Sequence, residues 1–520
     1  MPRFYIENFG CRATQADGAA LERQFLERGL DRAEAARDAE IVVLNTCTVT
    51  SGADKDTRAS IRRLQRVNPN CKILVTGCYA QRAPEELAAL PGVTWVVGNS
   101  HKHQVADIAT RPPSSAEQFV SLSQLLNEPH SENVFVGDIF AHTELLAAPV
   151  FEAANGRTRP NLKVQDGCDN RCSFCVIPYV RGQSRSLPAE RVIAEVRTLV
   201  DAGYREVVIS GINLGRWGRD LEGSSQLSAV SFQSKPATDN LRLEALIRAI
   251  LSRTTLEKLR ISSVEPMDWS DALIELVASS DRIAKHAHVP LQSGSDAVLR
   301  RMHRKYRPWH YREKILKIRA AMPNAAIGAD VMVGFPGETE AEFEETQRMI
   351  EELPFTYLHV FTYSARPGTP AAEALGQVAT GVARERNRVL REIASRKKAA
   401  FTQALVGTTV KAITLHSGEP GLTETLTDNY LKMRIAGPYE ANRWIEVNVT
   451  GVKGEMLLGE CVGDGTVRLN DLSSPASTLR RAHLPARFCT TSGATDAKVH
   501  GNQQKTLTCN PLPAYDNKNQ

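Results

Sequence analysis

Three cysteines share one short loop, in the sequence CDNRCSFC at residues 168–175. The loop follows the apolar segment Leu162–Gln165, which reads as a strand. A structural zinc site usually takes a fourth cysteine or histidine nearby, and none follows Cys175 within the next turn. Three thiolates at Cys168, Cys172 and Cys175 instead suit a 4Fe–4S cluster in which one iron has no protein ligand. Zinc binding and plain packing of the thiols are the alternatives.

The open iron of such a cluster has a specific chemical use. S-adenosylmethionine can chelate it through its amino and carboxylate groups, and an electron from the cluster then breaks the sulfonium bond and releases a deoxyadenosyl radical. The cysteine spacing, with the aromatic Phe174 before the third cysteine, resembles that of the radical S-adenosylmethionine (radical SAM) superfamily. This loop therefore predicts radical chemistry.

Three further cysteines each come just after a predicted strand. They end the runs NFGC, NTC and TGC, which place Cys11, Cys47 and Cys78 close to glycine or asparagine. In a parallel sheet such positions gather at the carboxyl edge, where ligand sites form. Cytosolic cysteines are also commonly buried as small apolar residues, and that is the alternative reading. Three strand ends with the same pattern favour a second iron–sulfur cluster.

Residues 1–110 alternate strands with helices, which predicts a doubly wound parallel sheet. The expected strands are Arg3–Asn8, Ile41–Asn45, Lys72–Thr76 and Thr94–Val97, with helices at Asp17–Arg28 and Ala53–Val67. Residues 111–156 mix proline, serine and isolated apolar patches, and we expect a connector there.

Residues 157–400 resume the alternation and predict a partial (β/α)6 barrel with its chemistry at the carboxyl ends of the strands. The expected strands are Leu162–Gln165, Glu206–Ser210, Lys258–Ser262, His286–Pro290, Ala326–Val333 and Tyr357–Tyr363. A Ser-rich stretch at 221–240 reads as a surface loop, and a long charged helix at Val382–Leu405 ends the domain.

Residues 404–470 predict a small all-β barrel, because short strands are joined by glycine-containing turns. The expected strands are Thr408–Leu415, Leu431–Ile435, Arg443–Val449 and Leu457–Cys461. Residues 471–520 are rich in Ser, Thr, Asn, Gln and Pro, and we expect a disordered tail.

The composition of the 520 residues, with 42% hydrophobic and 24% charged, is typical of a globular protein with several domains. No apolar run is long enough for a membrane span or resembles a signal peptide, so we expect a cytoplasmic protein. Ten cysteines are too few for a disulfide scaffold in a chain of this length. The net charge of +5 permits a polyanionic partner without requiring one.

Together these segments, from about residue 4 to about residue 467, resemble the radical SAM methylthiotransferase family. Members add CH3–S to a carbon of RNA or protein. In that family the N-terminal domain carries one cluster, the radical SAM core carries the other, and a small TRAM β-barrel binds RNA. The sequence DNYLK at residues 428–432 resembles part of the TRAM domain.

Three branches of the family differ in substrate. One modifies isopentenyladenosine in tRNA, another an aspartate of a ribosomal protein, and the MtaB branch modifies threonylcarbamoyladenosine beside the anticodon. The MtaB branch is the one most resembled by the runs NTCTVT at 45–50, GINLG at 211–215, RISSVEP at 260–266 and YSARPGT at 363–369. The chain has GCRATQ at 10–15 where GCKVNQ is usual, and Ala329 where a threonine is usual before Asp330. Both departures leave the six cysteines in place.

The resemblance implies a transferase that forms 2-methylthio-threonylcarbamoyladenosine at position 37 of tRNAs with S-adenosylmethionine and two 4Fe–4S clusters. Cys168, Cys172 and Cys175 would be catalytic, and Cys11, Cys47 and Cys78 would hold the second cluster. The implied partners are the tRNA anticodon loop and an electron donor such as flavodoxin or ferredoxin, with no membrane and no DNA. The alternatives are the two other branches and, in another class, a non-catalytic iron–sulfur RNA-binding protein.

Further cofactor contacts are expected in the cluster loop, at Phe174, and at the ends of later barrel strands. Ser210, Gly211 and Asn213 follow the second strand, where exposed backbone can contact the methionine part of S-adenosylmethionine. Glu265 follows the third strand and Gln292 a later one. An ion pair between Glu265 and a neighbouring arginine is an equal alternative. Arg181 and Arg185 can bind phosphate or carboxylate, or form structural ion pairs.

Overall fold

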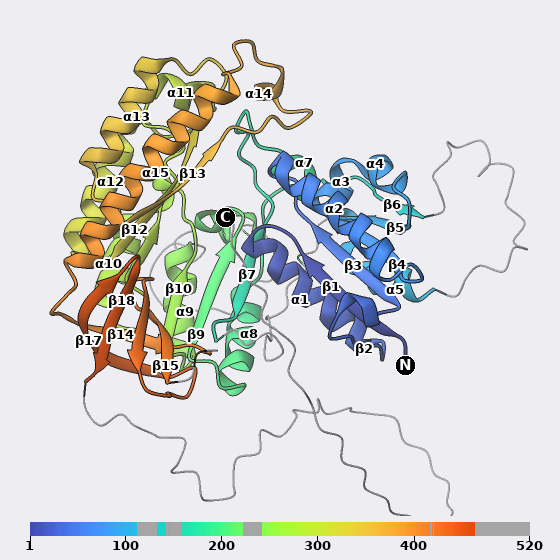
Figure 1. Ribbon diagram of the computed structural model, residues 1–520, viewed down its shortest axis with the longest axis horizontal. Helices are drawn as coiled ribbons and strands as arrows, with labels where there is room; N and C mark the ends of the chain where they lie inside the picture. Colours follow the sequence, from blue (N-terminus) through green and yellow to red (C-terminus); the bar gives the residue numbers. More distant parts are fainter. Residues whose placement is uncertain are drawn as a thin grey trace, which may run out of the picture. The chain divides into compact units, whose positions relative to one another are not determined.

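The computed structural model describes residues 1–111, 133–141, 145, 158–221, 242–416, 419 and 421–462 (Figure 1). All of these fall within residues 1–470, which form one compact unit. The expected loop beyond Leu221 and the expected tail lie outside the described residues. No helix of the described part is long and apolar enough to cross a membrane.

The N-terminal sheet has six parallel strands in the order β2-β1-β3-β4-β5-β6. The strands are β1 (Arg3–Asn8), β2 (Asp31–Arg32), β3 (Ile41–Thr46), β4 (Lys72–Gly77), β5 (Val93–Gly98) and β6 (Val134–Phe135). The helices are α1 (Arg12–Glu27), α2 (Ser51–Val67), α3 (Cys78–Arg82), α4 (Pro84–Ala88) and α5 (Val105–Thr110), with 3-10 turns at Ala36–Asp38 and Asn99–Gln104. Separate apolar cores on the two faces confirm the predicted doubly wound sheet.

Several elements differ from the expectation for this region, because β2, α3, α4 and α5 were not expected. Helix α1 begins five residues earlier than expected, at Arg12, directly after Cys11. Strand β6 lies in the segment expected to be a connector and pairs with β5. Two residues give too short a pattern to reveal a strand in the sequence.

The central region is a partial barrel, as predicted. Its parallel strands follow the order β7-β9-β10 in one sheet and β11-β12-β13 in another, with the short antiparallel β8 (Arg185–Ser186) beside β7. Isolated bridges join the two sheets between β10 and β11. The strands are β7 (Asn161–Asp166), β9 (Glu206–Gly211), β10 (Lys258–Ile261), β11 (His286–His288), β12 (Ala326–Val333) and β13 (Tyr357–Thr362).

Helices pack around these strands and complete one large apolar core. They are α7 (Ile177–Arg181), α8 (Ala189–Asp201), α9 (Leu243–Arg253), α10 (Asp271–Ser279), α11 (Asp296–Arg301), α12 (Pro308–Ala321), α13 (Glu340–Glu352), α14 (Pro370–Glu373) and α15 (Thr380–Gln403), with 3-10 turns at Leu214–Arg216, Arg219–Leu221 and Pro266–Asp268.

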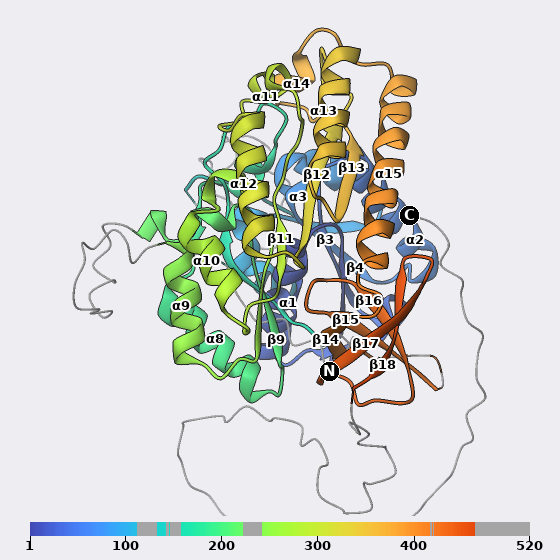
Figure 2. The same ribbon diagram turned by 90° about the vertical axis from the view of Figure 1, so that its left-hand side faces the viewer.

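The C-terminal strands form a closed barrel in the order β14-β15-β16-β18-β17, which lies at the end of α15 (Figure 2). They are β14 (Thr409–Thr414), β15 (Leu422–Thr427), β16 (Lys432–Ala436), β17 (Trp444–Lys453) and β18 (Met456–Cys461). The predicted all-β barrel is confirmed, with one strand more than expected. Strand β15 has the sequence LTETLT, whose polar residues hid it, although Thr423, Thr425 and Thr427 are buried and hydrogen-bonded.

The N-terminal domain contacts both ends of the strand arc of the partial barrel. Helix α1 packs on β1 of its own sheet and on β7 of the barrel (Figure 1). Beyond β13, Arg366 donates to the buried carboxylate of Asp54 in α2 with a nitrogen–oxygen distance of 2.8 Å. The N-terminal domain therefore contacts the partial barrel both at its first strand, β7, and just beyond its last strand, β13.

Candidate active site at two groups of cysteines

The strands that precede Cys11, Cys47 and Cys78 are direct neighbours in the sheet, in the order β1-β3-β4. Gly10 allows the first two cysteines to approach, because a Cβ on it would lie 2.5 Å from the Cβ of Cys47, and its φ of 94° also favours glycine. Gly77 before Cys78 has a φ of 101° and lies against the backbone of Thr46. The structure thus brings the three cysteines to one edge.

The thiols at this edge influence one another. Burial and the neighbouring Cys78 and Cys11 raise the pKa of Cys47 to about 12. Cys47 and Cys78 are buried, whereas Cys11 is exposed. Asn99, at the end of β5, donates to the sulfur of Cys78 at 3.6 Å and to the carbonyl of Val180 at 2.7 Å. Three adjacent thiols can all ionise when their negative charges are neutralised by bound iron. This group therefore fits an iron–sulfur cluster, which binds cysteines as thiolates.

The loop of Cys168, Cys172 and Cys175 connects β7 to α7 and is held by its backbone. The amide of Cys168 donates to the carbonyl of Gly182, and Ser173 donates from its amide to Met302 and from its hydroxyl to Arg301. Burial and the neighbouring Cys172 raise the pKa of Cys175 to about 12. Three free thiolates would repel one another in this loop, whereas the positive charge of bound iron would stabilise them. The loop therefore also fits an iron–sulfur cluster.

N–H donors aim at two of these sulfurs. The side-chain amide of Asn213 donates to Cys168 at 3.6 Å, and Arg304 donates to Cys172 at 3.4 Å. Hydrogen bonds to cluster sulfurs tune reduction potentials. Arg304 is a site residue that the sequence did not reveal, because it reaches the loop from a turn more than 100 residues away.

The expected contacts to S-adenosylmethionine fall at the strand ends around this loop. Ser210, Asn213 and Gln292 each have a buried side-chain oxygen that has no hydrogen-bond partner among the described residues. Gln292 also has a φ of 63°, which is rare for a residue with a side chain. Gly211 packs against Gln165, whose side chain accepts from the amide of Asn213. Unpaired buried oxygens are costly, so this arrangement fits a ligand with N–H or O–H donors.

Two predicted cofactor contacts also have protein partners. Glu265 forms an ion pair with Arg304, which was the alternative reading of this carboxylate, and so connects to Cys172 through that arginine. Phe174 packs edge-on against Phe335 with ring centroids 6.4 Å apart.

A buried charge cluster joins the N-terminal domain to the loop of the partial barrel. Asp17 of α1 binds Lys102 at 2.9 Å, Arg181 at 2.9 Å and Lys163 of β7. Asp166 binds Lys163 at 2.7 Å and Arg181 at 2.9 Å. Burial alone would raise the pKa of Asp166, but Arg181 and Lys163 hold it well below its usual range. Of the two readings of Arg181, the structure shows the structural ion pair.

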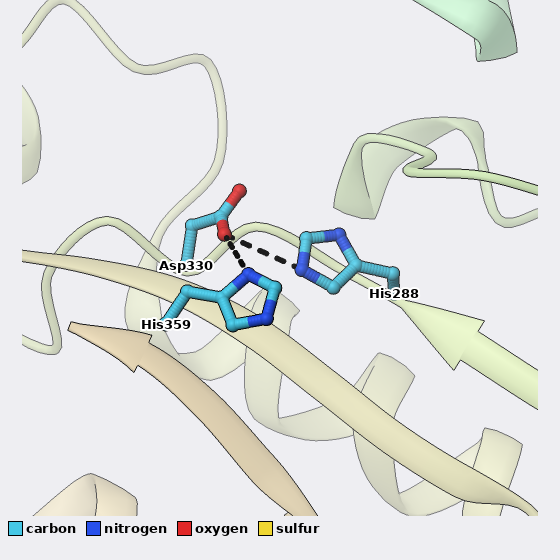
Figure 3. A group of neighbouring side chains, drawn as sticks. All are labelled: His288, Asp330 and His359. Carbon is cyan, nitrogen blue, oxygen red and sulfur yellow. Dashed lines mark ion pairs between the residues drawn. The ribbon is translucent and has the colours of Figure 1, made fainter. Parts of the chain in front are cut away.

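A second polar group lies on neighbouring strands of the partial barrel (Figure 3). Asp330 on β12 lies between two histidines, His288 on β11 and His359 on β13. One ring nitrogen of each histidine lies 3.3 Å from the same carboxylate oxygen of Asp330. His288 also shares a hydrogen bond of 2.5 Å with Ser263. Two imidazoles and a carboxylate can hold a divalent metal ion or carry protons. The alternation HAH in β11 was the only sequence signal of this group.

Comparisons with known proteins agree with this arrangement. Residues 3–98 match the family model described as "Uncharacterized protein family UPF0004", and residues 162–350 match the "Radical SAM superfamily". The MtaB threonylcarbamoyladenosine tRNA methylthiotransferase of Bacillus subtilis is 36% identical over 440 residues, which are 83% of this chain and 90% of the relative. The MtaB protein of Aquifex aeolicus is 33% identical over 442 residues, 85% of this chain and 98% of the relative.

More remote similarities were also found. A tRNA-2-methylthio-N(6)-dimethylallyladenosine synthase of Bacillus subtilis is 29% identical over 89% of this chain and 86% of the relative. Among solved structures, the radical S-adenosylmethionine methyltransferase TsrM from Kitasatospora setae has a TM-score of 0.48 and 14% identity, over 71% of this chain and 74% of that chain.

The cysteine loop on the partial barrel and the two family models define the class as a radical SAM enzyme, which implies S-adenosylmethionine and one 4Fe–4S cluster as cofactors. Relatives above 30% identity that cover most of both chains specify the family further. The chain belongs to the family of MtaB threonylcarbamoyladenosine tRNA methylthiotransferases.

Substitution of Asp17 tests the charge cluster. Asp17→Ala leaves three buried cations with one carboxylate, and we expect a loss of about 3–5 kcal/mol in the free energy of unfolding measured with urea. Asp107→Ala removes an exposed pair with Arg28 and is the control, with a loss of at most about 1 kcal/mol. Equal midpoints for the two variants would contradict the structural role of the cluster.

The pH dependence of the same variant follows from the sign of the shift. Burial raises the pKa of Asp17, but Lys102, Lys163 and Arg181 outweigh it and lower the pKa below its usual value. A lowered folded-state pKa stabilises the protein above the unfolded-state pKa, so stability falls on acidification below about pH 4. The Asp17→Ala variant should lose less stability than the unsubstituted protein between about pH 4 and pH 2.

Thiol labelling tests the geometry of the cysteines. Because only the thiolate reacts, iodoacetamide at pH 8 should label Cys47 and Cys175 of metal-free protein at least about tenfold more slowly than the exposed Cys11. Mass spectrometry of peptides measures each rate, and labelling in denaturant is the control in which the difference disappears. Equal rates in the native protein would show that Cys47 is not packed among its neighbours.

Proposed function

We propose that the chain transfers a methylthio group to carbon 2 of threonylcarbamoyladenosine at position 37 of tRNAs, forming 2-methylthio-threonylcarbamoyladenosine. The 36% identity to an MtaB protein, over 83% of this chain and 90% of that protein, carries this proposal. The three-cysteine loop and the three adjacent cysteines of the N-terminal sheet support it, because the chemistry needs both a radical and a place for sulfur. We further propose that the enzyme acts in the cytoplasm with a flavodoxin or ferredoxin as electron donor.

Six cysteines hold the clusters in this proposal. Cys168, Cys172 and Cys175 would hold the radical cluster, and Cys11, Cys47 and Cys78 would hold a second 4Fe–4S cluster, which would supply a place for the sulfur. When bound, the radical cluster supplies the one-electron chemistry that activates an inert C–H bond of the adenine ring. Ser210, Gly211, Asn213 and Gln292 hold S-adenosylmethionine at the strand ends, with Phe174 in the cluster loop.

The remaining residues of the site position these groups. Arg304 holds Cys172 and neutralises Glu265, so the carboxylate does not repel the nearby thiolates. Asn213 orients Cys168 while its backbone amide is fixed by Gln165. Asp17 fixes Lys163 and Arg181, which lie on either side of the cluster loop in the chain. The target base must leave the anticodon-loop stack, which costs less in a loop than in a duplex.

The proposed domains divide the work. Residues 1–110 carry the second cluster, and β6 adds a strand to their sheet. Residues 157–400 form the radical SAM core, and residues 404–470 bind RNA as a TRAM barrel.

Product analysis with defined substrates tests the proposal. Reconstituted, reduced protein with S-adenosylmethionine is offered anticodon stem–loops carrying threonylcarbamoyladenosine or isopentenyladenosine, and a ribosomal protein with a target aspartate. We expect methylthiolation of threonylcarbamoyladenosine alone. A methylthio product on either of the other two substrates would assign the chain to another branch of the family. If no deoxyadenosine is formed, the chain would be a non-catalytic RNA-binding protein.

Cysteine variants test for two separate clusters. Cys168→Ala and Cys47→Ala should each retain about half of the iron and sulfide of the reconstituted protein, since each removes one ligand of one cluster. Cys168→Ala should form no deoxyadenosine, whereas Cys47→Ala should still form it but yield no methylthio product. Cys71→Ala lies outside both groups and is the control with full iron content. A full complement in Cys47→Ala would refute the second cluster.

A further inference from the structure

Three arginines from separate segments surround the ring of Tyr430, in the turn between β15 and β16. The guanidinium carbons of Arg12, Arg159 and Arg260 lie 6.0, 5.9 and 5.2 Å from the ring centroid. Arg12 begins α1 directly after Cys11, Arg159 precedes β7, and Arg260 lies in β10. The N-terminal domain, the partial barrel and the small β-barrel thus all contribute to one group, which we call the arginine group.

The arginine group carries more positive than negative charge. Glu206 accepts from Arg260 at 2.6 Å and lies 3.7 Å from Arg159. Within the part of the chain that the structure describes, Arg12 has no carboxylate at ion-pair distance and donates instead to the hydroxyl of Tyr430 at 3.0 Å. Asp428 in the same turn is paired with Lys258 at 3.4 Å. Three guanidinium groups therefore share one carboxylate.

The excess of positive charge affects the neighbouring side chains. Burial, Arg260 and then other neighbours including Arg12 hold the pKa of His286 well below its usual value, so this histidine adds no further charge at neutral pH. The terminal nitrogen Nη2 of Arg260 is buried and has no hydrogen-bond partner in the part of the chain that the structure describes. A partly buried excess of cations with an unpaired donor is costly unless an anion joins it. The geometry therefore points to an anionic ligand.

A continuous row of polar and aromatic side chains leads from the arginine group along the strands of the partial barrel. The ring of Tyr430 lies 6.4 Å from that of Tyr357, which lies 5.3 Å from that of His359. His359 in turn pairs with Asp330, and its side chain is 62% exposed (Figure 3). The backbone carbonyl of Asp330 accepts from the amide of Gln292, one of the expected cofactor contacts.

The row thus runs between opposite ends of the strands. Glu206 and His286 are the first residues of β9 and β11, and Arg260 of β10 reaches Glu206 with its side chain, whereas the cysteine loop and Gln292 lie beyond the carboxyl ends. A ligand beside this row can contact the arginine group at one end and the cofactor site at the other. Cys11 is exposed next to Arg12, so the second cysteine group also borders this region.

We propose that Arg12 and Arg159, with the hydroxyl of Tyr430, bind the carboxylate of the threonylcarbamoyl group of the substrate nucleoside. This inference rests on the proposed function. Carbon 2 must face the cofactor, and the carboxylate lies several bonds away at the far end of the substituent on N6. Arginine suits it because a guanidinium offers a carboxylate two parallel N–H donors. An isopentenyl group has no charge to offset the arginine excess, so the same contact selects against it.

Binding measurements with a masked carboxylate test this assignment. Cluster-loaded protein is titrated with three anticodon stem–loops, which carry threonylcarbamoyladenosine, its carboxyl methyl ester or unmodified adenosine. The unsubstituted protein should bind the free acid about 10- to 100-fold more tightly than the ester, the range for a charge-assisted contact in a partly buried site. Arg12→Gln and Arg159→Gln should each reduce this ratio at least about fivefold while leaving the Kd for unmodified adenosine unchanged.

Two controls accompany the variants. Arg12→Lys keeps the charge and should retain part of the preference, and Arg23→Gln changes an exposed arginine of the same helix and should retain all of it. Iron and sulfide content is measured for each protein, because Arg12 adjoins Cys11. Arg159 adjoins no cysteine, because β7 separates it from Cys168, so its variant tests the contact with less of that risk.

The opposite outcomes are distinct. A preference for the acid that persists in both glutamine variants would overturn the assignment, as would equal weakening for all three stem–loops, which indicates contact with an RNA phosphate. In both cases the unsubstituted protein would still methylthiolate the free-acid stem–loop. If it forms no methylthio product from that stem–loop, the proposed function itself fails.

Discussion

Asp17 is a fully buried carboxylate whose charge has to be matched, and that requirement fixes the relation between the two cysteine groups. Its partners Lys102, Lys163 and Arg181 come from the N-terminal domain and from both sides of the radical SAM loop in the chain. A buried charge that loses a partner is far more costly than an exposed one. Helix α1, which carries Asp17 and begins next to Cys11, is therefore held against β7 and α7.

This arrangement explains why the N-terminal domain spans the ends of an incomplete barrel. One contact is made by α1 on β7, and the other by Asp54 with Arg366 beyond β13. A partial barrel leaves its first and last strands without each other as neighbours, and the N-terminal domain contacts both. The region bounded by Cys11, Arg12 and His359, where we propose that the nucleoside binds, then receives residues from the N-terminal domain and from the partial barrel.

Much of this could be predicted from the sequence, because local patterns carried it. The strands of the partial barrel agree with the expected ranges to within two residues at either end, and the three adjacent strands before Cys11, Cys47 and Cys78 were expected from their common position. Strand β15 was missed because its threonines are buried through hydrogen bonds to backbone and neighbours rather than through apolar packing. Strand β6 was missed because it is only two residues long.

The partners of charged residues could not be predicted, since they depend on contacts between distant segments. Nothing in the sequence of α1 distinguishes Asp17 from a solvated helix residue, and Glu265 and Arg304 are separated by a whole βα unit. The arginine group is of the same kind, because its members come from α1, the approach to β7, and β10. Sequence patterns predicted the six cysteines, and only the folded chain shows which charged and polar side chains surround them.

The most direct measurement of the central claim is the nucleoside content of tRNA from cells that lack this chain. The account predicts that 2-methylthio-threonylcarbamoyladenosine disappears and threonylcarbamoyladenosine accumulates. The chain itself should restore the methylthio nucleoside, whereas its Cys47→Ala and Cys168→Ala variants should not. Unchanged 2-methylthio-threonylcarbamoyladenosine in the deletion strain, measured by mass spectrometry of digested tRNA, would contradict the account.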